Sequence, residues 1–64
     1  MKKETKITKE IRAKINEQID KDFELIHSID TFHDYTGEEY IEVEGTLGGD
    51  VFQNRYYASG RGWK

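Results

Sequence analysis

Two consecutive glycines, Gly48 and Gly49, separate two stretches in which apolar and polar residues alternate. Alternation with a period of two is typical of β-strands, whose side chains point to opposite faces in turn. Two-residue hairpin turns need positive φ angles, which glycine adopts without steric cost. The sequence therefore predicts a β-hairpin with strands over residues 39–47 and 51–58 and a turn of type I′ or II′.

The two-residue turn also fixes the pairing of the strands. With Leu47 opposite Asp50, the numbers of cross-strand partners sum to 97, and Glu42 faces Arg55. Opposite charges at directly paired positions stabilise a sheet. A slip by one residue would place the apolar face of one strand beside the polar face of the other. The compatible pairs therefore support this register.

Large apolar residues recur every three or four positions before the hairpin. They are Ile7, Ile11, Ile15, Ile19, Phe23 and Ile26. This spacing is typical of an amphipathic helix, and Thr8 is suited to be its N-cap. We predict a basic N-terminal tail over residues 1–7 and a helix over residues 8–27, with an apolar face wide enough to pack on a sheet.

The segment 29–35 joins the predicted helix to the hairpin. Its alternation is weak, but an isolated two-stranded hairpin is only marginally stable in water and needs a further strand. We expect an edge strand at 29–35 and an α+β fold, in which the amphipathic helix packs on a small antiparallel β-meander in the order αβββ. Residues 59–64 show no pattern and are expected to be a C-terminal tail unless Trp63 packs on the core.

A chain of 64 residues with an apolar fraction of 34% can build only one thin core. It has no cysteine, so disulfides cannot reinforce that core. Self-association buries additional apolar surface, so we expect a single domain that forms a homodimer. The helix residues Ile7, Ile11 and Ile15 are the predicted oligomer interface, and a structural homo-oligomer is one hypothesis for function.

No apolar run approaches the length of a membrane helix, and no apolar segment follows the N-terminal lysines as in a signal peptide. We therefore expect a cytoplasmic protein. The chain is rich in Lys, Ile and Glu and contains no proline. Such a composition suits an AT-rich bacterial or phage genome.

The net charge of −3 is unevenly distributed along the chain. Residues 1–22 hold seven basic and five acidic side chains, residues 23–50 hold eight acidic and no Lys or Arg, and residues 51–64 hold three basic and none acidic. Acidic side chains on a hairpin can simply be solvated and protect a sheet edge. Without basic neighbours, however, they attract basic surfaces. The predicted partner-binding residues are Glu38, Glu39, Glu42, Glu44 and Asp50.

The leading functional hypothesis is a small non-enzymatic protein-binding module. It would be a regulator or inhibitor from a phage or mobile element that docks its acidic hairpin on a basic protein partner, such as a nucleic-acid-binding protein. An alternative is single-strand nucleic-acid binding by an aromatic and basic cluster near the C-terminus. That cluster comprises Arg55, Tyr57, Arg61 and Trp63. The overall acidity argues against nucleic acid as the main ligand.

Catalysis and metal binding find little support in the sequence. His27 and His33 lie near Asp30 and Asp34, but their spacing matches no recognised metal site. There is no cysteine, and no serine stands in a nucleophile motif. We therefore expect no enzyme activity, no metal and no cofactor.

Overall fold

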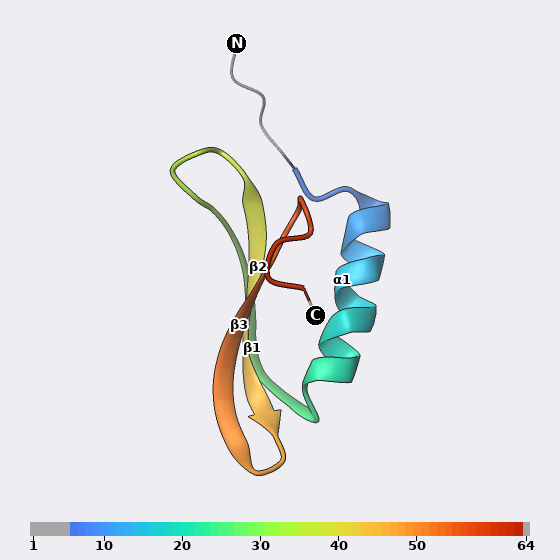
Figure 1. The fold of residues 1–64 in the computed structure, drawn as a ribbon, viewed down its shortest axis with the longest axis vertical. Helices are drawn as coiled ribbons and strands as arrows, with labels where there is room; N and C mark the ends of the chain where they lie inside the picture. Colours follow the sequence, from blue (N-terminus) through green and yellow to red (C-terminus); the bar gives the residue numbers. More distant parts are fainter. Residues whose placement is uncertain (1–5, 64) are drawn as a thin grey trace.

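The computed structural model describes residues 6–63. One helix, α1 (Lys9–Asp22), is followed by three strands, β1 (Leu25–His33), β2 (Glu39–Leu47) and β3 (Asp50–Tyr57). The strands form one antiparallel sheet with β2 in the centre, and α1 lies along one side of it (Figure 1). The predicted α+β meander in the order αβββ is confirmed.

The hairpin of β2 and β3 has the predicted register. Leu47 pairs with Asp50 and Glu42 pairs with Arg55. Gly48 and Gly49 have φ angles of 62° and 87°. Positive φ at both central positions is characteristic of a type I′ turn, whose twist matches that of the strands. β3 begins at Asp50 and ends at Tyr57, in each case one residue earlier than the predicted range 51–58.

The helix begins as predicted and ends earlier. The Thr8 side chain accepts a hydrogen bond from the Ile11 N–H at 3.2 Å, which caps α1. The prediction that the helix continues to His27 is wrong, because Phe23 is already extended and the Glu24 N–H donates to the Thr46 carbonyl at 2.8 Å. The backbone from Glu24 onward therefore forms hydrogen bonds with β2 instead of extending the helix by another turn.

The predicted edge strand exists, but it begins at Leu25, four residues before the predicted start at residue 29. β1 pairs with β2 from Leu25 to His33, with a bulge at His27 where the register shifts. It ends where the Asp34 carboxylate accepts hydrogen bonds from the N–H groups of Thr36 at 2.9 Å and Glu38 at 3.1 Å. Such side-chain bonds to nearby backbone stabilise a turn and compete with strand continuation. The predicted end at residue 35 is therefore also corrected.

The core lies between α1 and the sheet. Its buried members are Ile15, Ile19, Phe23, Ile41, Val43 and Tyr56. The Phe23 ring stacks on Phe52 with 4.6 Å between ring centroids. Gly45 makes room for this pair, since a Cβ atom there would collide with the Phe23 ring and the Leu25 carbonyl. Glycine at position 45 thus allows Phe23, the residue that follows α1, to pack directly on the sheet.

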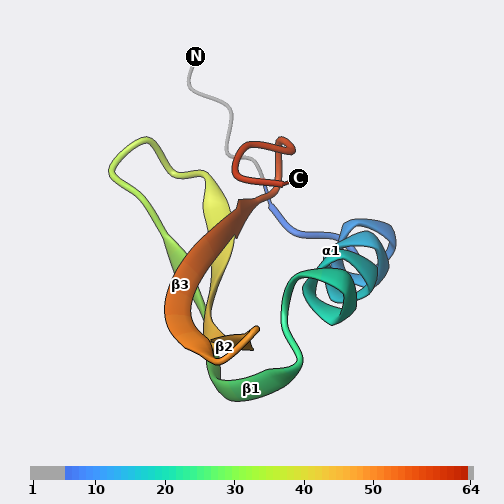
Figure 2. The same cartoon turned by 60° about the horizontal axis from the view of Figure 1, so that its bottom comes forward.

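Residues 58–63 fold back beside β3 on the side of α1 (Figures 1 and 2). The Tyr57 N–H donates to the Arg61 carbonyl at 3.0 Å, and the Trp63 indole N–H donates to the Tyr57 carbonyl at 3.0 Å. The Trp63 ring packs against the core. Residues 59–63 therefore do not form the unpatterned tail that was expected; the alternative, in which Trp63 packs on the core, is the one observed.

The Tyr56 hydroxyl connects the end of α1 to β3. It donates to the Asp22 carboxylate at 2.7 Å, and the ring has no exposed surface. Burial, assisted by the neighbouring Asp22 carboxylate, raises the pKa of Tyr56 to about 12. The neutral hydroxyl is therefore part of the folded core.

We expect Gly45→Ala to lower the free energy of unfolding by about 2 kcal/mol, because the added methyl group overpacks the contact with Phe23. Urea denaturation monitored by circular dichroism measures the change. Ser28→Ala, on exposed β1, is the control and should change stability by roughly 0.5 kcal/mol or less. Equal stability of Gly45→Ala and the unmodified chain would contradict the packing described.

The raised pKa of Tyr56 predicts a loss of stability at high pH. A group whose pKa is higher in the folded state gives stability that is complete below its ordinary pKa of 10.0 and is lost as pH rises to about 12. Tyr56→Phe should therefore lose less stability than the unmodified chain between these values, as measured by urea unfolding at each pH. Tyr35→Phe, at a 96% exposed position, should keep the original dependence.

Candidate functional site

The sheet has one face that α1 does not cover (Figure 2). Because side chains alternate along each strand, the pairing of the three strands determines which residues share this face. It carries Leu25, Ser28, Asp30 and Phe32 from β1, Tyr40, Glu42, Glu44 and Thr46 from β2, and Val51, Gln53, Arg55 and Tyr57 from β3. We call these twelve residues the open face. No helix or strand of residues 6–63 packs over it (Figure 2).

Three aromatic side chains cross the open face in a row. Phe32 pairs with Tyr40, and Tyr40 pairs with Tyr57, so that ring centroids are 5.9 Å and 4.8 Å apart. The Arg55 guanidinium lies 5.4 Å from the centre of the Tyr40 ring. We call Phe32, Tyr40 and Tyr57 the aromatic row. Phe32 is 46% exposed, so the row offers an apolar surface to a ligand.

A group of carboxylates lies beside the aromatic row. Asp30 pairs directly with Glu42, and Glu44 is the next outward residue of β2. Glu42 forms an ion pair with Arg55 at 3.2 Å. Within residues 6–63, Asp30 and Glu44 form no ion pair. Three carboxylates and one guanidinium leave a local negative charge, which attracts cations.

Glu38 is engaged within the chain rather than on the open face. Its carboxylate accepts a hydrogen bond from the Ser59 N–H at 2.9 Å and pairs with Arg61 at 2.8 Å. Asp34 pairs with the same guanidinium at 3.4 Å. Hydrogen bonding from Ser59, with a contribution from Arg61, holds the pKa of Glu38 below its ordinary value. These contacts fasten the β1–β2 turn to the C-terminal segment.

The other predicted partner-binding residues are also separated. Glu39 lies on the α1 side of the sheet, where its carboxylate accepts a hydrogen bond from the Ile7 N–H at 2.8 Å. Asp50 is exposed at the hairpin end, opposite Leu47 on that same side. Only Glu42 and Glu44 of the five predicted residues share the open face. The structure thus does not bring the predicted acidic set together.

The predicted nucleic-acid cluster is partly assembled. Arg55 and Tyr57 lie on the open face, and the Arg61 guanidinium lies 4.2 Å from the centre of the Tyr57 ring. Both guanidinium groups already pair with carboxylates. Trp63 packs against the core instead. The cluster therefore offers little free positive charge to a phosphate backbone.

The helical stripe predicted as an oligomer interface packs inside the single chain. Ile15 has no exposed surface, and Ile7 and Ile11 are partly buried against the core. Ile15 is therefore inaccessible to a partner in this fold. Self-association, if it uses apolar surface, needs another part of the molecule.

Sequence reasoning missed Asp30 and Phe32 as members of the site. Both belong to β1, and their neighbours become known only when the pairing of β1 with β2 is known. Asp30 and Phe32 are two positions apart, a spacing that places them on one face of a strand. The two-residue spacing could have indicated that Asp30 and Phe32 share a face, but only if the limits and pairing of β1 had been predicted correctly.

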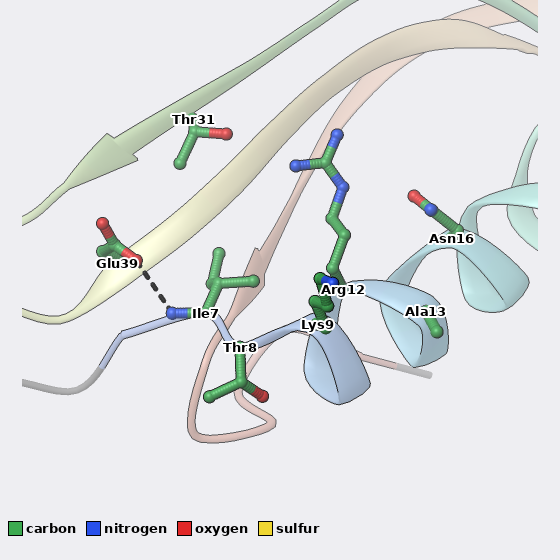
Figure 3. Close-up of a pocket in the computed structure, with 8 residues that line it drawn as sticks. All are labelled: Ile7, Thr8, Lys9, Arg12, Ala13, Asn16, Thr31 and Glu39. Carbon is green, nitrogen blue, oxygen red and sulfur yellow. Dashed lines mark hydrogen bonds between the residues drawn. The ribbon is translucent and has the colours of Figure 1, made fainter.

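A cleft separates the N-terminal half of α1 from the sheet (Figure 3). Its volume is about 420 Å³, and its lining residues include Arg12, Asn16, Thr31 and Glu39. The Arg12 side chain extends into this space, and the Glu39 bond to Ile7 lies at one end (Figure 3). The cleft is wide and open to solvent, and its single carboxylate is already hydrogen-bonded. These features do not assemble a catalytic group.

Residues 6–63 contain neither a cluster of metal-ligating side chains nor a helix that could span a membrane. No group of three or more His, Cys, Asp or Glu side chains is placed there to hold a metal ion. His27 instead shares a hydrogen bond of 2.8 Å with the Thr46 hydroxyl. No helix in this range has the length and apolar character needed to cross a membrane.

Comparison with known proteins gives no relative: no family model, curated protein or solved structure matches this chain. The open face itself is consequently the main indication of function. Its distinctive feature is an apolar aromatic row directly beside carboxylates with little neutralising charge.

The contacts of Glu38 predict how acid affects stability. A carboxylate whose pKa is lowered on folding gives stability that is present above its ordinary pKa of 4.5 and is lost as pH falls through the lower folded value. Glu38→Gln should be less stable at pH 7 and should lose less stability on acidification below pH 4.5. Urea unfolding at a series of pH values tests this, with Glu10→Gln on the exposed side of α1 as the control.

Proposed function

We propose that this chain is a small non-enzymatic protein-binding module whose open face docks on a basic surface of another protein. The observation that carries the proposal is the grouping of Asp30, Glu42 and Glu44 beside the aromatic row. In the cytoplasm of a bacterial or phage-infected cell, such a module would act as a regulator or inhibitor. A nucleic-acid-binding protein is one class of partner with the required basic surface.

The two parts of the open face suit the same type of side chain. An arginine or lysine can form a charge-assisted hydrogen bond with a carboxylate while its cation lies over an aromatic ring. Arg55 already does this within the chain, pairing with Glu42 and lying near Tyr40. A cation from a partner would find the same combination at Asp30 and Phe32, which are two positions apart on exposed β1.

The charge of the face also affects the rate of association. Clustered carboxylates attract a basic partner over distances of about 10 Å at moderate salt concentrations. The aromatic row then supplies apolar contact, which depends less on salt. We therefore expect docking that begins by electrostatic attraction and is maintained by aromatic contacts.

The aromatic row also raises the alternative of single-strand nucleic-acid binding, since exposed rings can stack on bases. Phosphate binding, however, needs unpaired basic side chains. Arg55 and Arg61 are in ion pairs, and Asp30 and Glu44 would repel phosphate. These charges favour a basic protein as the partner.

The test uses the double variant Asp30→Asn and Glu44→Gln, which removes two carboxylates that form no ion pair in residues 6–63. An arginine-rich peptide is titrated into the chain and followed by NMR chemical shifts. We expect binding with shifts centred on Phe32 and Tyr40, and a loss of affinity of about tenfold in the variant, equivalent to about 1.4 kcal/mol.

The matched control is Glu10→Gln with Glu17→Gln, which makes the same change in net charge on exposed positions of α1. It should keep most of the affinity of the unmodified chain. Equal losses in both double variants would show that only net charge matters and would refute the site. Tighter binding of a single-stranded oligonucleotide than of the peptide would favour the alternative.

A further inference from the structure

The two edges of the sheet are treated differently by the rest of the chain. At the C-terminal half of β3, the outward Tyr57 N–H bonds to the Arg61 carbonyl, and Gly62 lies against the Arg55 carbonyl. The Asn54 side chain also donates to the Gly62 carbonyl at 3.2 Å. Along β1, no segment of residues 6–63 pairs with the outer edge. The chain thus covers part of one edge and leaves the other open.

The open edge has an apolar character that soluble proteins normally avoid. Every residue of β1 is exposed, and Leu25, Ile29 and Phe32 have exposed fractions of 58%, 41% and 46%. The strand contains no lysine, arginine or proline, the residues that usually protect an edge from pairing with another chain. The bulge at His27 and the single carboxylate of Asp30 are the protective features that β1 has.

We propose that β1 pairs with β1 of a second copy of the chain. The two strands run antiparallel around a two-fold axis, and the two sheets join into one of six strands. A two-fold interface must be complementary to itself. The edge of β1 meets this condition. It has apolar side chains and no Lys or Arg, so two copies do not bring like cations together, and each strand supplies hydrogen-bond partners for the backbone of the other.

Backbone hydrogen bonding restricts the position of the axis. The Asp34 N–H donates to the carbonyl of Glu38, the residue directly before β2, so it points toward β2. Since N–H groups alternate in direction along an antiparallel strand, those of Ile29, Thr31 and His33 point away from β2. Outward groups must face outward groups of the second copy, so the axis passes through a residue and not between two residues. In the regular part of β1 beyond the bulge, the candidates near the middle of the strand are positions 29, 30 and 31.

The side chains then select Ile29 as the residue on the axis. An axis at Asp30 would place two carboxylates directly opposite each other, which is destabilising. An axis at Ile29 aligns the whole of β1 with its image, brings the two exposed Ile29 side chains together and places Asp30 opposite Ser28. The bulge at His27 then lies opposite Thr31, which limits the regular ladder to the residues around the axis.

The available area indicates a reversible dimer. Four apolar side chains of β1 are between 39% and 58% exposed. With roughly 200 Å² for each large side chain, they offer on the order of 400 Å² per copy, below the roughly 800 Å² of a standard stable interface. The expected association therefore depends on concentration.

Pairing at this edge would also enlarge the open face. A two-fold axis perpendicular to the sheet keeps the open faces of both copies on the same side. The carboxylate groups around Asp30 would then be neighbours across the axis. The dimer itself rests on the edge and apolar side chains of β1, so it stands or falls independently of peptide binding.

Sedimentation equilibrium of the full chain over a range of concentrations tests the proposal. We expect a monomer–dimer equilibrium for the unmodified chain and a monomer for Ile29→Lys, which would place two ammonium groups together at the axis. Val51→Lys is the matched control, since Val51 is a 60% exposed residue of β3, and it should dimerise normally. Unchanged circular dichroism verifies that each variant folds.

A cysteine variant tests the register, because the natural chain contains no thiol. Residues paired at the axis lie about 5.5 Å apart between Cα atoms, within the range that a disulfide spans. Ile29→Cys should therefore oxidise to a covalent dimer, and Val51→Cys should not. A concentration-independent monomer, a dimeric Ile29→Lys variant, or equal cross-linking at both positions would overturn the proposal. A dimer that fails to bind the arginine-rich peptide would refute only the proposed function.

Discussion

The pairing of β2 with β3 through the Gly48-Gly49 turn is the constraint on which the rest of the molecule depends. It assigns each residue of the hairpin to one of two faces. One face supplies the buried surface to which α1 attaches through Ile15 and Ile19. The other face keeps its polar and aromatic side chains accessible. The register set by this one turn therefore determines which side chains stabilise the fold and which remain available for binding.

The elements with a clear periodicity could be predicted from the sequence, and their junctions could not. The hairpin register follows from turn chemistry and agrees pair by pair with the structure. The helix end does not follow, because Ile26 fits both a helical spacing and a strand facing Gly45. Pairing of Glu24 and Leu25 with Thr46 of β2 selects the strand over the helix. This contact between distant parts of the chain produces no periodic pattern in the sequence.

The candidate site was predictable only in part for a related reason. Charge along the sequence identified an acidic region, but neighbouring residues of a strand point to opposite faces. Glu38 and Glu39 are adjacent in the chain, and they hold the C-terminal segment and the start of the helix respectively. Glu42 and Glu44, two apart, remain together. Asp30 joins them through a third strand whose position required the structure.

Acidic side chains add contacts between the sheet and the segments that flank it. Asp34 and Glu38 of the β1–β2 turn pair with Arg61, and Glu39 accepts a hydrogen bond from the Ile7 N–H. This arrangement fixes the C-terminal segment along β3 and leaves β1 as the strand with exposed apolar side chains. An open edge on a thin core is unfavourable for a monomer. Pairing of this edge would cover its unpaired backbone groups and also place the two acidic faces side by side, so a dimer would enlarge the open face without depending on a ligand bound there.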